Sequence, residues 1–552
     1  MSFEVVCKDV LGRIGRLKTK HGIIETPALF PVMNPLKSEI PAEKVLEVGF
    51  NSVITNAYII KRRYGDQAKI LGVHKILGVN CPVMTDSGAY QILVYGYAEV
   101  DPDEILIFQK EIGSDIGVIL DIPSRADESI EETASRVYET LRRAKRALEF
   151  RDELNGMLLV APIQGAPYKE LVKLSATKLS QLDFDIYAIG SPTQYLEEYR
   201  FREVIELTLT ARLNIPFSKP LHLFGAGHPL ILPLAVAMGC DLFDSASYIL
   251  YARDERYISA HGTLRLNNME YFPCNCPVCS KYTPSELREM NFHERVRLLA
   301  LHNLYEIKRE VNTIKEAIKE GFLWELIESR CKVHPSLWEA FKVVKKYSKI
   351  IEKYSVSTRA SAQGIFLLSP LSIFRPEVVR HTWRLVNNYA PAIRAKYLIF
   401  LPDTGEKPFI ENKIYRLLIR ELKKKLNEDK LSLINICIYN EFFGLVPVDI
   451  SETYPLSQHE RVNIEDNTLM AKKIKRIISD YILSIADEKS NSKVKIIVFC
   501  CSKFFYKIFK ELAFSINRKY SSIKFIIVVG SVNEYDKVVD VIVKAVSEWN
   551  YT

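Results

Sequence analysis

The 552-residue sequence has few long apolar runs, no basic apolar leader and few cysteines. Its longest apolar run, residues 229–239, is about half the length of a membrane-spanning helix, which argues against a membrane protein. The first seven residues lack the basic and apolar stretches of a signal peptide, so we expect a cytoplasmic protein. Ten cysteines in so long a chain do not suggest a disulfide framework. No low-complexity segment or internal repeat is visible.

The composition is that of an ordinary globular protein, but the charge is unevenly divided. Hydrophobic residues make up 48% and charged residues 26% of the chain, whose length predicts two to four domains. Residues 1–340 contain 40 Lys and Arg against 45 Asp and Glu, whereas residues 341–552 contain 35 against 22. The net charges of −5 and +13 suggest a catalytic body joined to an extension that binds a polyanion. Any single lysine-rich run is better explained as the solvated face of a helix.

Three of the ten cysteines stand close together. Cys274, Cys276 and Cys279 form a C-x-C-x2-C pattern, and after 22 intervening residues His302 lies in an expected helix. Alone, His302 would be interpreted as a histidine at a packing surface. Three thiolates and one imidazole fill a tetrahedral Zn²⁺ shell without an open position, so we predict one structural zinc ion.

The first 250 residues alternate short apolar strands with amphipathic helices, such as the one expected at residues 130–150. This alternation predicts βα units around a parallel sheet, and the number of strands favours a (β/α)8 TIM barrel over an open sheet. The expected strands are residues 52–55, 82–85, 116–120, 157–163, 186–189, 221–224 and 242–243, with one more near 27–32.

Polar residues and glycines follow these strands at the same end. In a (β/α)8 enzyme the active site is built at the carboxyl ends of the strands, so this clustering predicts the position of the site. An aspartate there can also act as a helix N-cap, which would explain one or two of the positions. The residues are Asp86, Asp121, Gln164, Gly190, Gly225 and Asp244.

The rest of the chain predicts a helical region followed by smaller domains. Helices are expected at residues 291–329 and 335–353, and the small polar residues 355–364 suggest a domain boundary. Strand-like runs at 431–439, 493–500 and 523–529 indicate a small α/β domain. We therefore expect a catalytic barrel with its zinc site at 1–345, a first extension domain at 346–430 and a small α/β domain at 431–552.

Several motifs occur in the order that is typical of one protein family. The chain resembles the tRNA-guanine transglycosylases, and among them the archaeal, archaeosine-type enzymes, most closely over residues 1–340 and more weakly beyond. The motifs are residues 84–91 (MTDSGAYQ), 120–124 (LDIPS), 163–165 (IQG), 188–192 (AIGSP), 239–245 (GCDLFDS), the FP pair at 272–273 with the zinc set, 374–378 (FRPEV) and 443–447 (FGLVP).

The resemblance implies a base exchange through a covalent ribosyl-enzyme, in the manner of a retaining glycosidase. It implies that Asp244 is the nucleophile and Asp86 the general acid/base. Asp121, Gln164, the Gly190 backbone and Ser87 would bind the purine, and Tyr90 would stack on it. Archaeal members usually have Phe in place of Tyr90, so the additional hydroxyl must find a partner.

The resemblance also implies the partners: tRNA, the free base 7-cyano-7-deazaguanine and a second copy in a homodimer. Archaeal members commonly end in a PUA domain. No barrel-like run of strands follows the α/β segment here, so either the basic extension alone binds tRNA or a separate PUA-domain protein assists it. Two alternatives remain open: a queuosine-type enzyme acting on the anticodon loop, and a non-catalytic tRNA-binding subunit. The long basic extension and residues 121–123 argue against the first alternative, and the presence of both Asp86 and Asp244 against the second.

Overall fold

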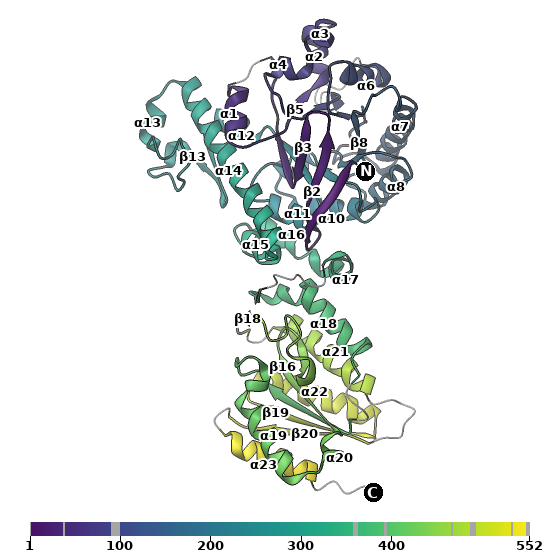
Figure 1. The fold of residues 1–552 in the computed structure, drawn as a ribbon, viewed down its shortest axis with the longest axis vertical. Helices are drawn as coiled ribbons and strands as arrows, with labels where there is room; N and C mark the ends of the chain where they lie inside the picture. Colours follow the sequence, from purple (N-terminus) through teal and green to yellow (C-terminus); the bar gives the residue numbers. More distant parts are fainter. Residues whose placement is uncertain are drawn as a thin grey trace. The chain divides into compact units, whose positions relative to one another are not determined.

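The computed structural model describes residues 2–36, 39–89, 100–356, 363–390, 395–464, 467–485, 493–531 and 534–547. The chain divides into two compact units, Met1–Val343 and Val344–Thr552, each with its own sheets (Figure 1). Among the described helices, none has the length and apolar character needed to span a bilayer.

The first unit is built around eight parallel strands, as predicted. Their hydrogen-bonded order is β4-β11-β10-β9-β8-β7-β6-β5, and a parallel bridge between Val32 and Ile54 joins the two end strands into a barrel. The strands are β4 (Ala28–Pro31), β5 (Val53–Asn56), β6 (Val83–Asp86), β7 (Ile116–Val118), β8 (Leu158–Ile163), β9 (Ile186–Ile189), β10 (Leu221–Leu223) and β11 (Leu242–Ser245).

Helices surround the barrel and bury apolar residues. The longest of the series, α7 (Ile130–Glu149), begins with a capping box of Ser129 and Glu132 and buries residues spaced three and four apart, including Val137, Leu141 and Ala144. The others are α1 (Ala42–Glu47), α2 (Ala57–Tyr64), α3 (Gln67–Leu71), α4 (Val73–Leu77), α6 (Pro102–Glu111), α8 (Lys169–Leu179), α9 (Thr193–Glu197), α10 (Phe201–Arg212), α11 (Leu232–Ala237) and α12 (Ser247–Arg253).

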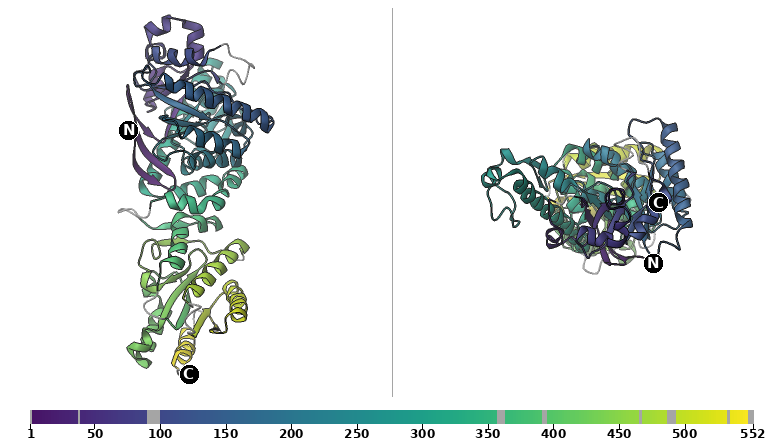
Figure 2. Two further views of the ribbon diagram at one scale, coloured as in Figure 1. Left: turned by 90° about the vertical axis from the view of Figure 1, so that its right-hand side faces the viewer. Right: turned by 90° about the horizontal axis from the view of Figure 1, so that it is seen from above.

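An antiparallel sheet of β1 (Phe3–Asp9), β2 (Gly12–Thr19) and β3 (Gly22–Thr26) precedes the barrel, and the sequence interpretation did not include it. The two loops between its strands are short. Phe3, Leu17 and Ile24 belong to the same buried cluster as barrel residues such as Phe30 and Ile54. The sheet therefore shares the hydrophobic core of the barrel, and Figure 2 shows its purple strands along one side of the unit.

The helical region after the cysteines is interrupted, which corrects the single helical region expected at 291–329. Helix α14 (Phe292–Glu320) ends at Gly321, which has a left-handed φ of 85°, and α15 (Leu323–Cys331) begins two residues later. The region expected at 335–353 likewise forms two helices, α16 (Pro335–Phe341) and α17 (Val344–Tyr354). The segment around the cysteines contains β12 (Arg256–Ser259), β13 (Gly262–Arg265), the 3-10 turn η1 (Leu266–Asn268) and α13 (Pro284–Glu289).

The second unit contains a five-stranded sheet in the order β17-β16-β15-β19-β20, parallel except for β17. Residues 346–430 and 431–552, expected to be separate domains, both contribute strands to it. The strands are β15 (Tyr397–Pro402), β16 (Ile434–Asn440), β17 (Gly444–Pro447), β19 (Val494–Cys500) and β20 (Ile523–Val529), and β14 (Ile365–Leu367) pairs separately with β18 (His459–Arg461).

Helices of the second unit pack in pairs beside this sheet, α19 with α23 and α21 with α22. Aromatic side chains of α22 contact the sheet, where Phe505 and Phe509 lie against Tyr439. The elements are α18 (Pro376–Asn387), α19 (Lys413–Lys425), α20 (Glu428–Leu431), α21 (Thr468–Ile485), α22 (Lys503–Lys519), α23 (Tyr535–Ser547) and the 3-10 turns η2 (Pro370–Phe374), η3 (Phe409–Glu411) and η4 (Val448–Ile450).

A buried ion pair fastens the antiparallel sheet to the amino ends of the barrel strands. Arg13 of β2 donates from Nε to Asp241 Oδ1 at 2.6 Å and from Nη2 to Oδ2 at 2.8 Å, and both side chains are buried. Asp241 also accepts the backbone N–H of Leu221 at 2.8 Å. The carboxylate therefore joins β2, β10 and β11 at one point.

Removing the arginine should destabilise the first unit. We expect Arg13→Ala to lower its free energy of unfolding by about 3–5 kcal/mol, because the buried Asp241 loses its main counter-charge. Urea unfolding followed by circular dichroism measures the change. Arg16→Ala on the same strand is the matched control, because Arg16 is exposed, and it should change stability by less than about 0.5 kcal/mol. Equal effects of the two substitutions would contradict this role for Arg13.

Candidate active site at the carboxyl ends of the barrel strands

Three carboxylates from three strands meet at the carboxyl end of the barrel. Asp86 ends β6, Asp121 follows β7 by three residues, and Asp244 is the penultimate residue of β11. Burial, together with the charges of Asp121 and Asp244, raises the pKa of Asp86 to about 7. A carboxyl group with this pKa can both give and take a proton near neutral pH, as general acid/base catalysis requires.

The side chain of Asn56 positions Asp86. Asn56 is the N-cap of α2, where its Oδ1 accepts the backbone N–H of Ile59 at 2.9 Å. Its Nδ2 donates to Asp86 Oδ2 at 3.0 Å. The helix cap therefore also orients the amide toward the carboxyl group.

Asp121 and Gln164 form a buried polar pair. Gln164 donates from Nε2 to Asp121 Oδ2, while its Oε1 accepts from Ser124 and from Ser191 Oγ at 3.0 Å. Burial raises the pKa of Asp121 to about 6, although the hydrogen bond from Gln164 opposes that rise. The two side chains present acceptor and donor atoms side by side, as the recognition of a purine edge requires.

Asp244 is held through one oxygen. Its Oδ1 accepts from His222 Nε2 at 2.8 Å and from the backbone N–H of Gly225 at 3.0 Å. Within the described ranges, Oδ2 of Asp244 accepts no hydrogen bond. His222 is fully buried on β10, between the rings of Phe30 and Phe224. The carboxylate is therefore oriented on one side and open on the other, an arrangement suited to a nucleophile.

The remaining predicted residues differ in how the structure places them. The Ser87 hydroxyl is buried and donates to Ile119 O at 3.2 Å. The Gly190 N–H donates to Ile163 O at 3.0 Å, so that a ligand would have to compete for it. A Cβ atom on Gly190 would lie 2.2 Å from Gln164 Nε2, so only glycine leaves room for that amide. Tyr90 lies outside the described residues.

Cys274, Cys276, Cys279 and His302 converge, and their ligand atoms could hold a metal ion. His302 Nδ1 lies 3.5 Å from Cys276 Sγ and 3.3 Å from Cys279 Sγ, and His302 Nε2 lies 2.9 Å from Ile258 O. Donation from Nε2 to that carbonyl leaves Nδ1 as the ligand atom, an arrangement common among metal-bound histidines. The ring of Tyr257 stacks on His302 at 3.7 Å and covers the site. The donor set therefore fits a closed, four-ligand metal site.

Two site residues were missed from sequence. His222 stands between Leu221 and Leu223 in an apolar strand, where it would be interpreted as a core residue, and Asn56 would be interpreted as an ordinary helix cap. Gly225 was noted at a strand end, but its contact with Asp244 was not foreseen. The polar residues at strand ends were the signal for the site, and a histidine inside a strand gave no such signal.

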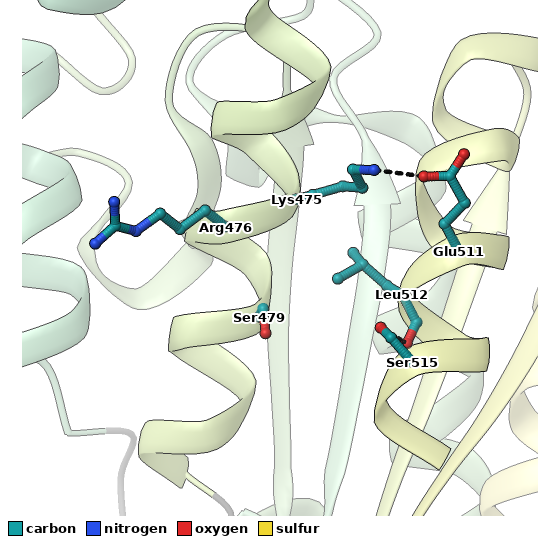
Figure 3. A pocket seen from close by; sticks show the side chains of 6 residues that line it. All are labelled: Lys475, Arg476, Ser479, Glu511, Leu512 and Ser515. Atoms are coloured by element: carbon teal, nitrogen blue, oxygen red, sulfur yellow. Dashed lines mark hydrogen bonds and ion pairs between the residues drawn. The ribbon is translucent and has the colours of Figure 1, made fainter. Parts of the chain in front are cut away.

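A pocket of about 410 Å³ opens in the second unit between α21 and α22 (Figure 3). Its one carboxylate, Glu511, is paired with Lys475. Its lining therefore offers no counterpart to the three interacting carboxylates of the barrel. The lining residues are Lys475, Arg476, Ser479, Glu511, Leu512 and Ser515.

Comparison with known proteins agrees with this geometry. Residues 7–336 match the protein family described as queuine tRNA-ribosyltransferase. A tRNA-guanine(15) transglycosylase of Pyrobaculum aerophilum is 48% identical over 462 residues, 83% of this chain and 90% of that protein. Proteins with the same name from Methanocaldococcus jannaschii and Sulfolobus acidocaldarius are 42% and 41% identical over 87% and 86% of this chain, and over 72% and 93% of their own lengths.

The raised pKa of Asp86 makes stability depend on pH. Above the ordinary pKa of an aspartate, the folded protein must hold a proton that the unfolded chain has lost, so this group's contribution to stability falls as pH rises through about 7. We expect Asp86→Asn to abolish base exchange and to gain stability relative to the native chain between pH 4.5 and pH 8. The gain should reach at most about 4 kcal/mol, since each pKa unit corresponds to about 1.4 kcal/mol.

Thermal melts across this pH range measure the difference between variant and native chain. Asp127→Asn is the control, because the Asp127 side chain is 76% exposed. The difference in melting temperature between this variant and the native chain should stay constant with pH. A constant difference for Asp86→Asn as well would show that the pKa of Asp86 is not raised in the folded protein.

Proposed function

Because this chain belongs to the queuine tRNA-ribosyltransferase family, we propose that it replaces guanine at position 15, in the D-arm of tRNA, with 7-cyano-7-deazaguanine, in archaeosine biosynthesis. The observation that carries the proposal is the meeting of Asp86, Asp121 and Asp244 at one end of the barrel. The archaeal relatives align with most of this chain, and their names specify guanine 15 of tRNA. They therefore support the D-arm position over the anticodon loop.

In the first half-reaction Asp244 attacks C1′ of the ribose with its open Oδ2. The new C1′–O bond forms as the C1′–N9 bond breaks, and the electron pair of that bond moves to guanine. His222 and Gly225 hold Oδ1 and so fix the direction of attack. Asp86, whose pKa of about 7 leaves a large fraction protonated at neutral pH, gives its proton to the departing base.

In the second half-reaction the free deazaguanine enters and loses its N9 proton to Asp86. Its N9 attacks C1′ and displaces the Asp244 carboxylate. Two displacements at the same carbon restore the original β-configuration, as in a retaining glycosidase. No water is consumed, and Asp86 ends protonated, ready for the next turnover.

Base recognition would fall to the buried pair beside these carboxylates. Asp121 would accept hydrogen bonds from N–H groups of the purine, while Gln164 and the Gly190 backbone would face its carbonyl side. Ser87 and Tyr90 remain predicted contacts, which would place the base and stack on it. The buried position of Asp121 and Gln164 supports this assignment, because polar groups discriminate best where water is excluded.

The second unit supports a polyanionic substrate. Residues 341–552, which include this unit, have a net charge of +13, and this excess of Lys and Arg suits contacts to phosphates of tRNA. The homodimer, the cytoplasmic location and a separate PUA-domain protein remain predictions. A non-catalytic tRNA-binding subunit is disfavoured, because both the proposed nucleophile and the proposed acid/base are present.

We further propose that the metal held by Cys274, Cys276, Cys279 and His302 is a structural Zn²⁺. Four protein ligands leave no position for water or substrate, so the ion would stabilise the segment that carries it without entering the reaction. His302 belongs to α14, so the ion would tie the cysteine segment to the longest helix of the first unit.

The nucleophile assignment can be tested by trapping. The native chain incubated with tRNA should give a covalent adduct on a denaturing gel, whereas Asp244→Asn should give none and lose on the order of 10⁴-fold or more in base exchange. Asp254→Asn, which changes an exposed aspartate, should behave as the native chain does. Mapping the exchanged nucleotide distinguishes position 15 from an anticodon-loop site. An adduct of equal strength in Asp244→Asn would remove this residue from the nucleophile role.

The zinc assignment is tested by metal content and melting temperature. Cys276→Ser should lose bound zinc and lower the melting temperature of the first unit, because the local segment depends on the ion. Cys501→Ser, at an exposed cysteine outside this cluster, should retain the metal and the native melting temperature. Full stability and activity after complete zinc removal, checked by elemental analysis, would contradict a structural role.

A further inference from the structure

A second group of possible metal ligands lies at the opposite end of the barrel from the catalytic carboxylates. His21 is in the turn between β2 and β3, His74 is in α4, and Asp115 immediately precedes β7. Asp115 accepts the backbone N–H of Val83, the first residue of β6, at 2.9 Å. The group therefore lies at the amino ends of β6 and β7, whereas Asp86 is the last residue of β6 and Asp121 lies beyond the carboxyl end of β7.

The three side chains point at one another with separations typical of neighbouring metal ligands. His21 Nδ1 lies 3.0 Å from Asp115 Oδ1, and His74 Nε2 lies 3.2 Å from Asp115 Oδ2. Ligands bound tetrahedrally at 2.0–2.1 Å lie roughly 3.3 Å apart. In the Cys274 site the His302 nitrogen is 3.3 Å from the Cys279 sulfur. The ligand atoms of the two clusters are therefore separated by similar distances.

The carboxylate is held in place as metal ligands usually are. The Asp115 side chain is fully buried, and each of its oxygens already accepts one backbone N–H, from His21 at 2.9 Å and from Val83. Such hydrogen bonds fix the orientation of a ligating carboxylate and leave each oxygen a second lone pair. Burial favours a higher pKa for Asp115, but the hydrogen bonds from the two histidines and these two amides together outweigh it and lower the pKa to about 2.

The cluster can be reached from solvent, because both histidines are partly exposed. The side chain of His21 is 42% exposed and that of His74 is 18% exposed, and their ring centroids are 3.8 Å apart. An ion bound here would keep at least one position for water, unlike an ion bound by the cysteines. Two imidazoles and one carboxylate suit Zn²⁺, Co²⁺, Ni²⁺ or Fe²⁺ better than Mg²⁺ or Ca²⁺, which prefer oxygen ligands.

We propose that His21, His74 and Asp115 form a second metal site, which binds one divalent first-row transition ion. The ion would join the β2–β3 turn to α4 and to the start of β7, three segments that are distant in sequence. Together with the Arg13–Asp241 pair it would fasten the antiparallel sheet to the barrel at a second point. The site is independent of the proposed reaction, because its ligands lie away from the proposed catalytic carboxylates.

The experiment titrates the metal-free full chain with Co²⁺ and follows its absorption spectrum. We expect two equivalents to bind. One should give the intense sulfur-to-cobalt charge-transfer bands of a thiolate site, and the other only weak visible bands of nitrogen and oxygen ligation. His21→Ala should bind one equivalent and keep the charge-transfer bands, whereas Cys276→Ser should lose those bands and keep the second site. His261→Ala, at an exposed histidine, should bind two equivalents.

Melting curves add a second measurement. The second equivalent of Co²⁺ should raise the melting temperature of the native chain and of His261→Ala but not that of His21→Ala. His21→Ala should fold, because the turn is half-exposed and the backbone N–H bond to Asp115 is retained. A native chain that binds one equivalent, or a His21→Ala variant that still binds two, would overturn the proposal and leave a hydrogen-bonded His–Asp–His cluster.

Discussion

The active-site geometry depends on the closure of the barrel between β4 and β5. In the hydrogen-bonded order of the strands, β11 with Asp244 and β6 with Asp86 are separated by β10, β9, β8 and β7. In a flat sheet, five strand spacings would put these two carboxylates roughly 24 Å apart. The bridge between Val32 and Ile54, with the Met33 N–H donating to Ile54 O at 2.8 Å, closes the barrel between β4 and β5. Asp244 and Asp86 are then separated only by β4 and β5. Burial and the nearby Asp121 raise the pKa of Asp86 most, and the further contribution of the Asp244 charge exists because this short parallel contact forms.

Gathering carboxylates at one end of a barrel has an energetic cost, and the surrounding residues offset part of it. Asn56, His222, Gly225 and Gln164 each donate a hydrogen bond to one of the three aspartates. None of these donors brings a cation of fixed charge into the site, so the aspartates are oriented without being neutralised. A fixed cation would stabilise the fold further, but it would lower the pKa of Asp86 and reduce its value as an acid.

The barrel could be predicted from sequence because its strands are short, mostly apolar runs separated by amphipathic helices such as α7. The ends of those runs also pointed to Asp86, Asp121, Gln164 and Asp244. The β1–β3 sheet was missed, although Leu17 and Ile24 are buried. The partners of the aspartates were missed for another reason, since His222 contacts Asp244 only because β10 and β11 are neighbours in register. Gly321 breaks the long helix by its left-handed backbone, a conformation that the apolar periodicity around it does not reveal.

The lack of a side chain at Gly190 couples three residues of the site to one another. Even one methyl group there would occupy the space of the Gln164 amide, so any side chain at position 190 would push that amide out of its present position. Gln164 in turn is bonded to Asp121, and a shorter residue would leave that carboxylate without its donor. Residues 121, 164 and 190 therefore form one packed and hydrogen-bonded unit, in which a change at position 190 reaches Asp121 through Gln164.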